Sequence, residues 1–451
     1  MHPPGAPSAR LRHRSQSIGR MTAFAALLPA AALLAAATTA ATTAASAVVG
    51  PVPGAPRPDT APYVVVLKDT ASRIPAHTLA AEAADAGDEV GAVYDAALNG
   101  FAVRTTAARA AALATDPRVA SVEPDTEFHT TDTPDTPSTP AAGATATPDT
   151  PGTPGTGTPA PATPAPQSGP QAPAPWSLDR IDQRELPLDG SYTYPGRAAG
   201  VTVYVVDTGI NTGHREFGGR ARLGYNAVFL GSSRDCSGHG THVAATVGGE
   251  TYGVAKGVSL VGVKVADCRG SAPLSAILKG LDWVVRDAAR APATPAVANM
   301  SIGGSRSRAL DAAVVRAVAS GITFVAAAGN DGKNACGGSP AAVPQAITVG
   351  ATDDQDRRAR FSNHGPCVDL SAPGVGITSA WKDSPTATAR SSGTSMAAPH
   401  VAGVAALVLA RGTARTPAQV TRELLHSAVS DRITGLPAGT PNLLLHTPTG
   451  R

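Results

Sequence analysis

Residues 201–209 read VTVYVVDTG, in which five of the first six residues are apolar or aromatic and Asp207 follows directly. An apolar run of this length, closed by Asp-Thr-Gly, is the pattern of a buried strand that ends in a turn. A carboxylate at that place is unfavourable unless another group pairs with it. The segment therefore predicts a strand whose carboxyl end holds a paired Asp207.

Similar patterns alternate with helical ones from Trp176 to about Leu445. The further buried-strand patterns cover residues 259–265, 296–300, 323–327 and 346–349. The helical patterns cover residues 239–247, 272–288, 307–320, 395–410 and 417–427. This alternation predicts an α/β fold with a mostly parallel central sheet and helices on both faces. In such a sheet the active crevice lies beyond the carboxyl ends of the strands.

Two more motifs complete a hydrolytic set with Asp207. Residues 238–242 read GHGTH and residues 393–397 read GTSMA, so aspartate, histidine and serine occur in an order that a known class of serine hydrolase uses. His239 would take the proton of Ser395, and Asp207 would orient the imidazole. Asn330 follows an apolar run and would donate to the oxyanion beside the Ser395 N–H group. The three motifs together predict a serine endopeptidase.

Each motif alone also has a simpler structural explanation. Gly-Thr-Ser is a common capping turn, and Asp-Thr-Gly and Asn330 both favour turns. His242 lies three residues after His239, but no H-E-x-x-H pattern or third ligand supports a metal pair, so we expect a buried, hydrogen-bonded histidine. An esterase or lipase would use the same groups, but Ser395 lacks the G-x-S-x-G pattern. A catalytically inactive binding protein is the other alternative, and the filled catalytic positions argue against it.

The N-terminus has the pattern of an export signal. Four arginines precede an apolar run at about residues 23–37, and a small-residue stretch then ends in Ala45-Ser46-Ala47. This pattern predicts a secretory signal peptide over residues 1–47 and a secreted, extracellular protein. A membrane anchor is the alternative, but the run is short of about 20 apolar residues. We expect no stable membrane insertion.

Charge and cysteine content agree with export. Lys and Arg number 37 and Asp and Glu 34, and this net charge of +3 disfavours a nucleic-acid partner. All four cysteines lie in the C-terminal half, where an oxidising compartment favours disulfides over a zinc site without C-x-x-C. Spacing alone leaves three connectivities open. These cysteines are Cys236, Cys268, Cys336 and Cys367.

A smaller unit precedes the α/β region. Residues 62–130 show the order strand, helix, two strands, helix, strand, which predicts a small α+β domain of the ferredoxin-like type. Residues 131–173 consist almost wholly of Thr, Pro, Ala, Gly, Asp and Ser. Such a composition cannot bury enough apolar surface to order itself, so we expect an extended linker.

The motifs resemble those of the subtilases, most closely the proteinase K branch with its aqualysin-like members. The resemblance covers the chain from about Pro175 onward and includes residues 175–183, 262–265, 299–304 and 361–363. It implies a three-layer subtilisin-like peptidase domain over residues 174–446. It also implies endopeptidase action through Asp207, His239 and Ser395, with Asn330 in the oxyanion hole.

The resemblance also implies how substrates bind. An extended peptide would lie between two segments of the enzyme, with main-chain hydrogen bonds that tolerate many sequences. The wall of the first pocket is small and uncharged, which implies a broad preference for apolar or aromatic side chains before the scissile bond. The residues concerned are Gly270, Ser271, Ala272, Ser301, Ile302 and Gly303 for the two segments, and Ala327, Ala328 and Gly329 for the pocket.

In aqualysin-like members the matching cysteines pair as Cys236–Cys268 and Cys336–Cys367, and we adopt that pairing. The resemblance further implies structural calcium, Ca²⁺, at two candidate sites. The first would use Asp369 with the carbonyl groups of Pro344 and Ala346. For the second site an acidic cluster that caps a helix is an equal alternative. Its candidate ligands are Asp179, Asp182, Gln183, Asp189 and Ser191.

Residues 62–130 resemble the subtilisin propeptide and inhibitor domain. The resemblance implies a domain that assists folding, inhibits the enzyme intramolecularly and is removed by autocatalytic cleavage. The long linker departs from related precursors, so cleavage near Thr130 would leave a tail on the mature enzyme and cleavage near Ala174 would not. Protein or peptide substrates and the chain's own propeptide are the expected partners, and we expect a monomer.

Overall fold

The computed structural model describes residues 59–69, 75–134, 168–228 and 231–447. Most of the predicted linker, residues 135–167, and the whole predicted signal peptide lie outside these ranges. Among the described helices, none combines the length and the apolar composition needed to cross a bilayer.

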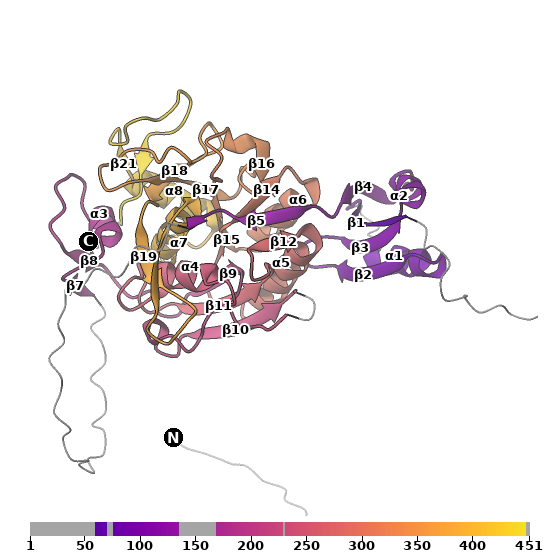
Figure 1. Ribbon diagram of the computed structural model, residues 1–451, viewed down its shortest axis with the longest axis horizontal. Coiled ribbons are helices and arrows are strands. Elements are labelled where there is room, and N and C mark those ends of the chain that lie inside the picture. The colour runs from indigo at the N-terminus through magenta and orange to yellow at the C-terminus, as the bar shows by residue number, and fades with distance from the viewer. Residues whose placement is uncertain (1–58, 70–74, 135–167, 229–230, 448–451) are drawn as a thin grey trace, which may run out of the picture. The chain divides into compact units, whose positions relative to one another are not determined.

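The smaller N-terminal domain is called the prodomain below, because its sequence resembles subtilisin propeptides. It is a four-stranded antiparallel sheet in the order β2-β3-β1-β4, with two helices (Figure 1). Its elements follow the predicted order and are β1 Thr60–Leu67, α1 Ala76–Asp85, β2 Glu89–Tyr94, β3 Gly100–Thr106, α2 Ala107–Ala114 and β4 Val119–Pro124. Alternate residues of β1 face opposite sides, so Val65 and Leu67 pack with the helices while Val64 and Val66 pack with the peptidase domain.

A nine-stranded sheet forms the centre of the peptidase domain, in the order β10-β11-β9-β13-β15-β17-β18-β22-β21. All neighbouring pairs are parallel except β21 with β22. The strands are β9 Thr202–Asp207, β10 Ala221–Asn226, β11 Ser259–Lys264, β13 Ala296–Met300, β15 Thr323–Ala327, β17 Ile347–Thr352, β18 Leu370–Pro373, β21 Val429–Ser430 and β22 Leu443–Leu444. The predicted α/β class and mostly parallel sheet are confirmed.

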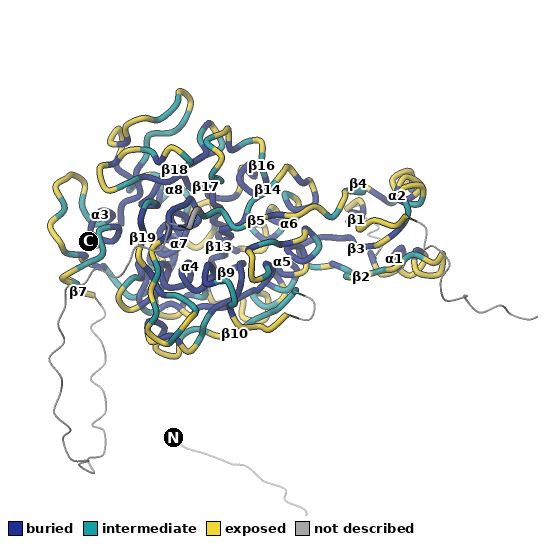
Figure 2. The backbone as a smooth tube through the Cα atoms, viewed as in Figure 1, coloured by how far each residue is buried: buried dark blue, intermediate teal, exposed yellow. Residues whose placement is uncertain are grey.

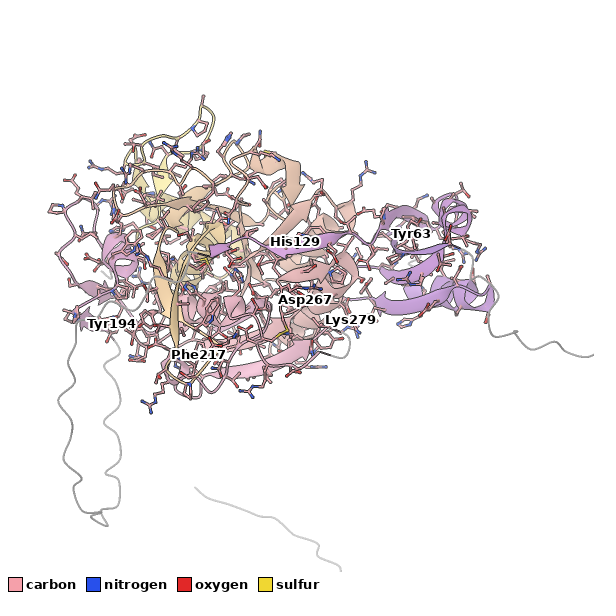
Figure 3. The ribbon with its side chains drawn as sticks, in the orientation of Figure 1. Tyr63, His129, Tyr194, Phe217, Asp267 and Lys279 are labelled. Atoms are coloured by element: carbon pink, nitrogen blue, oxygen red, sulfur yellow. A yellow bond between two sulfur atoms is a disulfide. The ribbon has the colours of Figure 1, made fainter. Side chains whose placement is uncertain are left out.

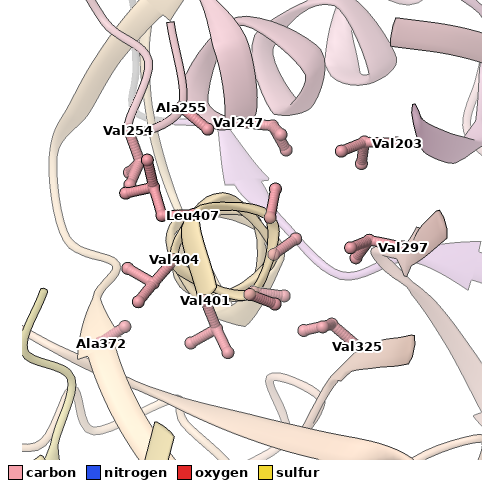
Figure 4. Packing of buried hydrophobic residues seen from close by; sticks show 14 of the residues in the cluster. Val203, Val247, Val254, Ala255, Val297, Val325, Ala372, Val401, Val404 and Leu407 are labelled. Atoms are coloured by element: carbon pink, nitrogen blue, oxygen red, sulfur yellow. The ribbon is translucent and has the colours of Figure 1, made fainter. Parts of the chain in front are cut away.

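One face of this sheet packs against α7 Thr394–Ala410, of which every residue except Ala410 is buried. Figure 4 looks along this helix and shows valines of the strands, such as Val203, Val297 and Val325, around it. The helices α4 His239–Gly248 and α8 Pro417–Ser427 pack beside α7. Figure 2 shows the same region as continuous dark blue. The helix that begins beside Ser395 is therefore the centre of the core.

The opposite face packs against α5 Leu274–Ala289 and α6 Arg308–Ala319. The sequence pattern placed the start of α5 at residue 272, but residues Ser271–Pro273 form the strand β12 instead. This strand pairs with β5 Glu127–Thr130, which also pairs with β14 Ile302–Ser305. Pairing with another segment therefore overrides the helical pattern at these residues.

The described ends of the predicted linker are strands. β6 Thr133–Pro134 pairs with β20 Thr388–Ser392, and β7 Gly169–Gln171 pairs with β8 Tyr192–Tyr194. Proline has no N–H to donate but is tolerated in an edge strand, and β6 and β7 both lie at the edge of their sheets. The extended linker is therefore shorter at both ends than composition predicts.

The remaining short elements all belong to the larger domain. They are α3 Trp176–Asp182, η1 Arg215–Phe217, η2 Ala335–Gly337, β16 Gly338–Ser339 and β19 Ile377–Ala380.

Candidate active site

Asp207 and His239 form a buried pair at the carboxyl end of β9. Asp207 is the last residue of that strand, and His239 opens α4. Oδ1 of Asp207 lies 2.7 Å from Nδ1 of His239, and both side chains are at most 1% exposed. Burial by itself lowers the pKa of His239, but the charges of Asp207 and Asp132 outweigh this effect and raise the pKa to about 9. When the imidazole is neutral, the contact with Asp207 keeps its proton on Nδ1 and leaves Nε2 as the basic nitrogen.

Ser395 lies in the first turn of α7, close to this pair. Its hydroxyl donates to the carbonyl of Ser301 at 3.0 Å and lies 2.5 Å from the hydroxyl of Thr131. Nε2 of His239 is buried and has no hydrogen-bond partner within the described chain. The serine hydroxyl must therefore turn from Ser301 toward His239 before the imidazole can take its proton.

Two donors converge on the carbonyl oxygen of Thr131. Nδ2 of Asn330 lies 2.5 Å from that oxygen, and the backbone N of Ser395 lies 3.3 Å from it. The amide of Asn330 is held by Thr394, whose N–H and hydroxyl both donate to Oδ1 at 2.9 Å. A Cβ on Gly393 would lie 2.4 Å from the Thr131 oxygen, so only glycine leaves room for the carbonyl. This geometry suits stabilisation of an oxyanion.

The segment before Thr131 lies as a strand between the two predicted binding segments. β5 pairs antiparallel with β12 on one side and with β14 on the other. Thr130 donates its N–H to the carbonyl of Gly270 at 2.9 Å, and Thr131 donates to that of Ser301 at 3.2 Å. Figure 3 shows His129 on this strand. The chain's own residues 127–131 thus lie in an extended cleft that ends at Ser395.

A cavity of about 440 Å³ opens beside Thr131. Its walls include the three predicted pocket residues Ala327, Ala328 and Gly329, together with Gly303. A Cβ on Gly329 would lie 2.4 Å from Nδ2 of Asn363, and Gly329 has a φ of +100°, so a larger residue is excluded there. The pocket is therefore spacious, and its wall at these positions consists of small, uncharged residues.

Two family models match the chain. One described as "Subtilase family" matches residues 198–445, and one described as "Peptidase inhibitor I9" matches residues 62–131. The chain belongs to the subtilase family. The family match covers the α/β domain, and the inhibitor match covers the prodomain together with the strand in the cleft.

Individual relatives agree with this assignment. The chain is 45% identical over 424 residues to "Extracellular serine proteinase" of Thermus sp. (strain Rt41A), which covers 88% of this subtilase and 92% of the relative. It is 51% identical over 280 residues to "Alkaline serine exoprotease A" of Vibrio alginolyticus, over 62% of this chain and 51% of that one. The "Crystal structure of a cold adapted subtilisin-like serine proteinase" matches with a TM-score of 0.59 and 50% identity, over 62% of this chain and 100% of that one. This subtilase is a serine peptidase.

Both predicted disulfides are confirmed. Cys236 and Cys268 are bonded, and so are Cys336 and Cys367. The first bond joins the segment before His239 to the segment that carries Gly270. His242 is buried, with Nε2 2.9 Å from the carbonyl of Ile377, and burial lowers its pKa to about 4. It is therefore neutral and has a structural role beneath the catalytic pair.

The two candidate calcium sites differ in their fit. Asp369 is mostly buried, accepts the N–H of Thr348 at 2.8 Å, and its pKa rises to about 6 because burial disfavours its charge. A cation beside this carboxylate and the carbonyl groups of Pro344 and Ala346 would relieve that cost. The donor set is therefore chemically suitable for calcium.

The second candidate set is occupied by other hydrogen bonds. Asp179 accepts the N–H groups of Asp189 and Gly190, Asp182 accepts that of Thr193, and Asp189 binds Ser191. The amide of Gln183 donates to two carbonyl groups of the same loop. Within the described ranges, no three or more His, Cys, Asp or Glu side chains gather around one point. Burial and the charges of Asp179 and Asp189 also raise the pKa of Asp182 to about 6, as burial does for Asp369, so this set stays a candidate calcium site whose oxygen atoms also cap the loop.

Sequence reasoning missed three of the residues that build this site. The sequence places Thr131 in the predicted linker and Thr394 inside a motif, and it gives no signal for Asp235, which accepts hydrogen bonds from Thr208 Oγ1 and from the Gly238 N–H. A polar residue beside each motif was the only available signal, and such residues are common in turns.

Carboxylates from both domains hold the prodomain on the enzyme. Glu123 accepts from Ser307 Oγ at 2.8 Å and from the Ala309 N–H at 3.1 Å, at the start of α6. Asp125 accepts from the N–H and the hydroxyl of Ser275 at the start of α5. In return, Asp282 accepts three consecutive N–H groups of the prodomain, those of residues 95–97. The starts of α5 and α6 thus each receive a favourable negative charge, from Asp125 and Glu123 respectively.

Proposed function

We propose that this subtilase is a secreted serine endopeptidase in which Asp207, His239 and Ser395 carry out hydrolysis and Asn330 stabilises the oxyanion. The observation that supports this most directly is the position of the Thr131 carbonyl between Asn330 Nδ2 and the Ser395 N–H. A peptide carbonyl held by two donors beside a serine hydroxyl is the geometry of an acyl-transfer site.

The reaction then uses each group in turn. Ser395 Oγ attacks the carbonyl carbon while its proton passes to Nε2 of His239, and Asp207 stabilises the imidazolium through Nδ1. The oxyanion accepts hydrogen bonds from Asn330 and from the Ser395 N–H. When the C–N bond breaks, His239 gives the proton to the amine, and water hydrolyses the resulting ester by the same path. All these proton transfers occur at one imidazole nitrogen.

The pocket supports a broad preference before the scissile bond. A volume of about 440 Å³ accommodates an aromatic ring, and the walls at Gly303, Ala327, Ala328 and Gly329 carry no charge. Asp331 and Lys333 also line the cavity, with opposite charges. We propose that apolar and aromatic side chains bind here, while β12 and β14 bind the backbone of any sequence.

The same geometry supports a proposal for the maturation site. Because the Thr131 carbonyl accepts from both Asn330 Nδ2 and the Ser395 N–H, we propose that autocatalytic cleavage occurs at the bond from Thr131 to Asp132. Cleavage there releases the prodomain with β5 at its C-terminus and leaves Asp132 at the start of the mature chain. The Thr- and Pro-rich segment then remains on the enzyme.

We also propose export and calcium binding. The N-terminal signal pattern, the two disulfides and the extracellular Thermus relative support secretion. The buried carboxyl group of Asp369 supports one calcium ion with a structural role. When bound, that ion would hold the 344–346 loop against β18.

The proposal is tested by labelling the active serine with a fluorophosphonate probe and locating the N-terminus of the secreted protein by intact mass. We expect labelling that Ser395→Ala abolishes, and a precursor of that variant that keeps its prodomain attached. Labelling that persists in the variant would defeat the catalytic assignment. A wild-type N-terminus outside Asp132 or its C-terminal neighbours would defeat the assigned maturation site.

A further inference from the structure

Asp235 is a buried carboxylate, 7% exposed, just before the disulfide at Cys236. It accepts five hydrogen bonds, and the proposed reaction gives it no role. Four of the five come from the segment that carries His239. The donors are the Ser237 N–H at 3.0 Å, the Gly238 N–H at 2.8 Å, the Thr241 N–H at 2.9 Å, the Thr241 hydroxyl at 2.6 Å and the Thr208 hydroxyl at 2.9 Å.

The fifth bond links Asp235 to the other half of the catalytic pair. Thr208 donates its hydroxyl to Asp235 and its N–H to Asp207 Oδ1 at 2.7 Å. The same hydroxyl accepts the N–H of Gly240 at 2.9 Å. A Cβ on Gly240 would lie 2.2 Å from the carbonyl of Gly209, so the first turn of α4 packs directly on the end of β9. Asp235 therefore binds both segments whose relative position sets the distance from Asp207 to His239.

A buried lysine offsets the charge of Asp235. Lys264 ends β11 beside Asp207, and its Nζ donates to the carbonyl of Thr208 at 2.7 Å and to that of Arg234 at 3.2 Å. Burial lowers the pKa of Lys264, and the charges of Asp235, Asp207 and Asp267 oppose that effect. Lys264 and Asp235 thus both bind main-chain groups in the segment that precedes His239.

We propose that Asp235 is a positioning residue for the peptidase reaction, because it holds the His239 segment and Thr208 in the register that the Asp207–His239 contact requires. This inference rests on the proposed function. It predicts that loss of Asp235 lowers turnover rather than substrate affinity. The five hydrogen bonds of Asp235 all go to residues 208 and 237–241, and none goes to the binding segments β12 and β14.

The test compares Asp235→Asn with Glu216→Gln. Glu216 is also a buried carboxylate, and it accepts the N–H groups of Thr251 and Tyr252 beyond the opposite end of α4. Ten residues of helix place that end about 15 Å from His239. Both precursors are processed by a trace of tagged wild-type enzyme, which is then removed, and intact mass verifies the mature, disulfide-bonded product. Thermal unfolding and peptide hydrolysis are measured on each.

We expect kcat of Asp235→Asn to fall about 10²-fold with KM within about twofold, because a shift of about 1 Å in a catalytic group has this effect. Glu216→Gln should lose thermal stability and keep its kcat. Equal losses of stability with kcat unchanged in both variants would overturn the proposal.

If Asp235→Asn does not fold, two variants of Thr208 test the same proposal. Thr208→Val removes the bridging hydroxyl and should lower kcat about tenfold, whereas Thr208→Ser keeps the hydroxyl and should retain wild-type turnover. Equal turnover in the two Thr208 variants would also overturn the proposal. A wild-type enzyme that fails to react with the phosphonate probe would instead defeat the proposed function, so the two failures are distinguishable.

Discussion

The prodomain and the peptidase domain complete their cores in different ways. The peptidase sheet has both faces covered by its own helices, and α7 is buried along almost its whole length. The prodomain covers only one face with α1 and α2, and its other face shares an apolar cluster with α5 and α6. The peptidase domain thus forms its core from its own elements, whereas part of the prodomain's apolar surface is buried only by contact with the peptidase domain.

This difference bears on how an inhibitor domain is held on the enzyme. The peptidase groups that make polar contacts to the prodomain are mainly helix termini and strand edges, which water can satisfy if the proposed cleavage releases the prodomain. The prodomain contributes carboxylates and one extended strand to them. Inhibition therefore depends on a few anchors, and the following experiments remove them one at a time.

The largest effect is expected from Phe128→Ala in the isolated prodomain, residues 59–131, added in trans to mature enzyme. Phe128 is fully buried in β5 and touches the position of Gly304, where a Cβ would lie 2.6 Å from its ring. Loss of a buried aromatic ring costs about 3–5 kcal/mol, so the inhibition constant should rise from about 10²-fold to several thousandfold. His129→Ala, at an exposed neighbour, is the control and should change it about twofold or less. Similar effects of both changes would show that the strand binds through its backbone alone.

A smaller effect is expected from Glu123→Gln, measured by the same inhibition assay. The change removes the charge at the start of α6, where Glu123 binds Ser307 and Ala309. Hydrogen bonds to charged groups contribute about 1.5–3 kcal/mol, so inhibition should weaken about 10- to 100-fold. Glu89→Gln changes an exposed carboxylate on β2 and should have no effect. An unchanged inhibition constant for Glu123→Gln would mean that the Glu123 contact does not help to hold the prodomain.

The change Asp132→Asn should alter the pH dependence of self-cleavage. The negative charge of Asp132 raises the pKa of His239, and only the neutral imidazole can accept the serine proton. The variant should therefore have a lower His239 pKa, and its rate of precursor cleavage should rise at a lower pH than in the wild type. Stopped time courses from pH 6 to 10 measure this. Mature enzyme from both precursors should show one common profile on peptides, and an acid limb that does not move would exclude a role of Asp132.

The smallest effect is expected from calcium removal. Burial raises the pKa of Asp369 to about 6, so protons compete with a cation for this carboxyl as the pH falls below that value. Calcium at about one hundred times its Kd should raise the Tm by roughly 5–10 °C at pH 8 and by clearly less at pH 5. Chelator titrations followed by calorimetry measure this difference. Asp369→Asn should abolish the calcium response, while Asp354→Asn, at an exposed position, should keep it.

Sequence patterns predicted the long elements well, because a fully buried strand such as β9 or a helix such as α7 leaves a continuous apolar signal. They did not predict β12 or β6, since those strands exist through pairing with another segment. The residues proposed as catalytic stand out in the sequence because each lies in a tight small-residue motif. Thr131 and Asp235 were missed, because their roles depend on neighbours that are distant in sequence or hidden in a common turn composition.

The burial of α7 has a practical meaning for anyone who wishes to redesign this enzyme. Ser395 begins a helix that is enclosed by β13, β15 and β17, so the nucleophile is a fixed reference point that cannot be shifted without repacking the interior. At the rim of the cavity the glycines differ, because a Cβ on Gly303 would meet only ordinary contacts of 3.4 Å or more, whereas one on Gly329 would lie 2.4 Å from Asn363. New specificity is therefore to be sought at positions such as Gly303, while Gly329 and the serine helix are left intact.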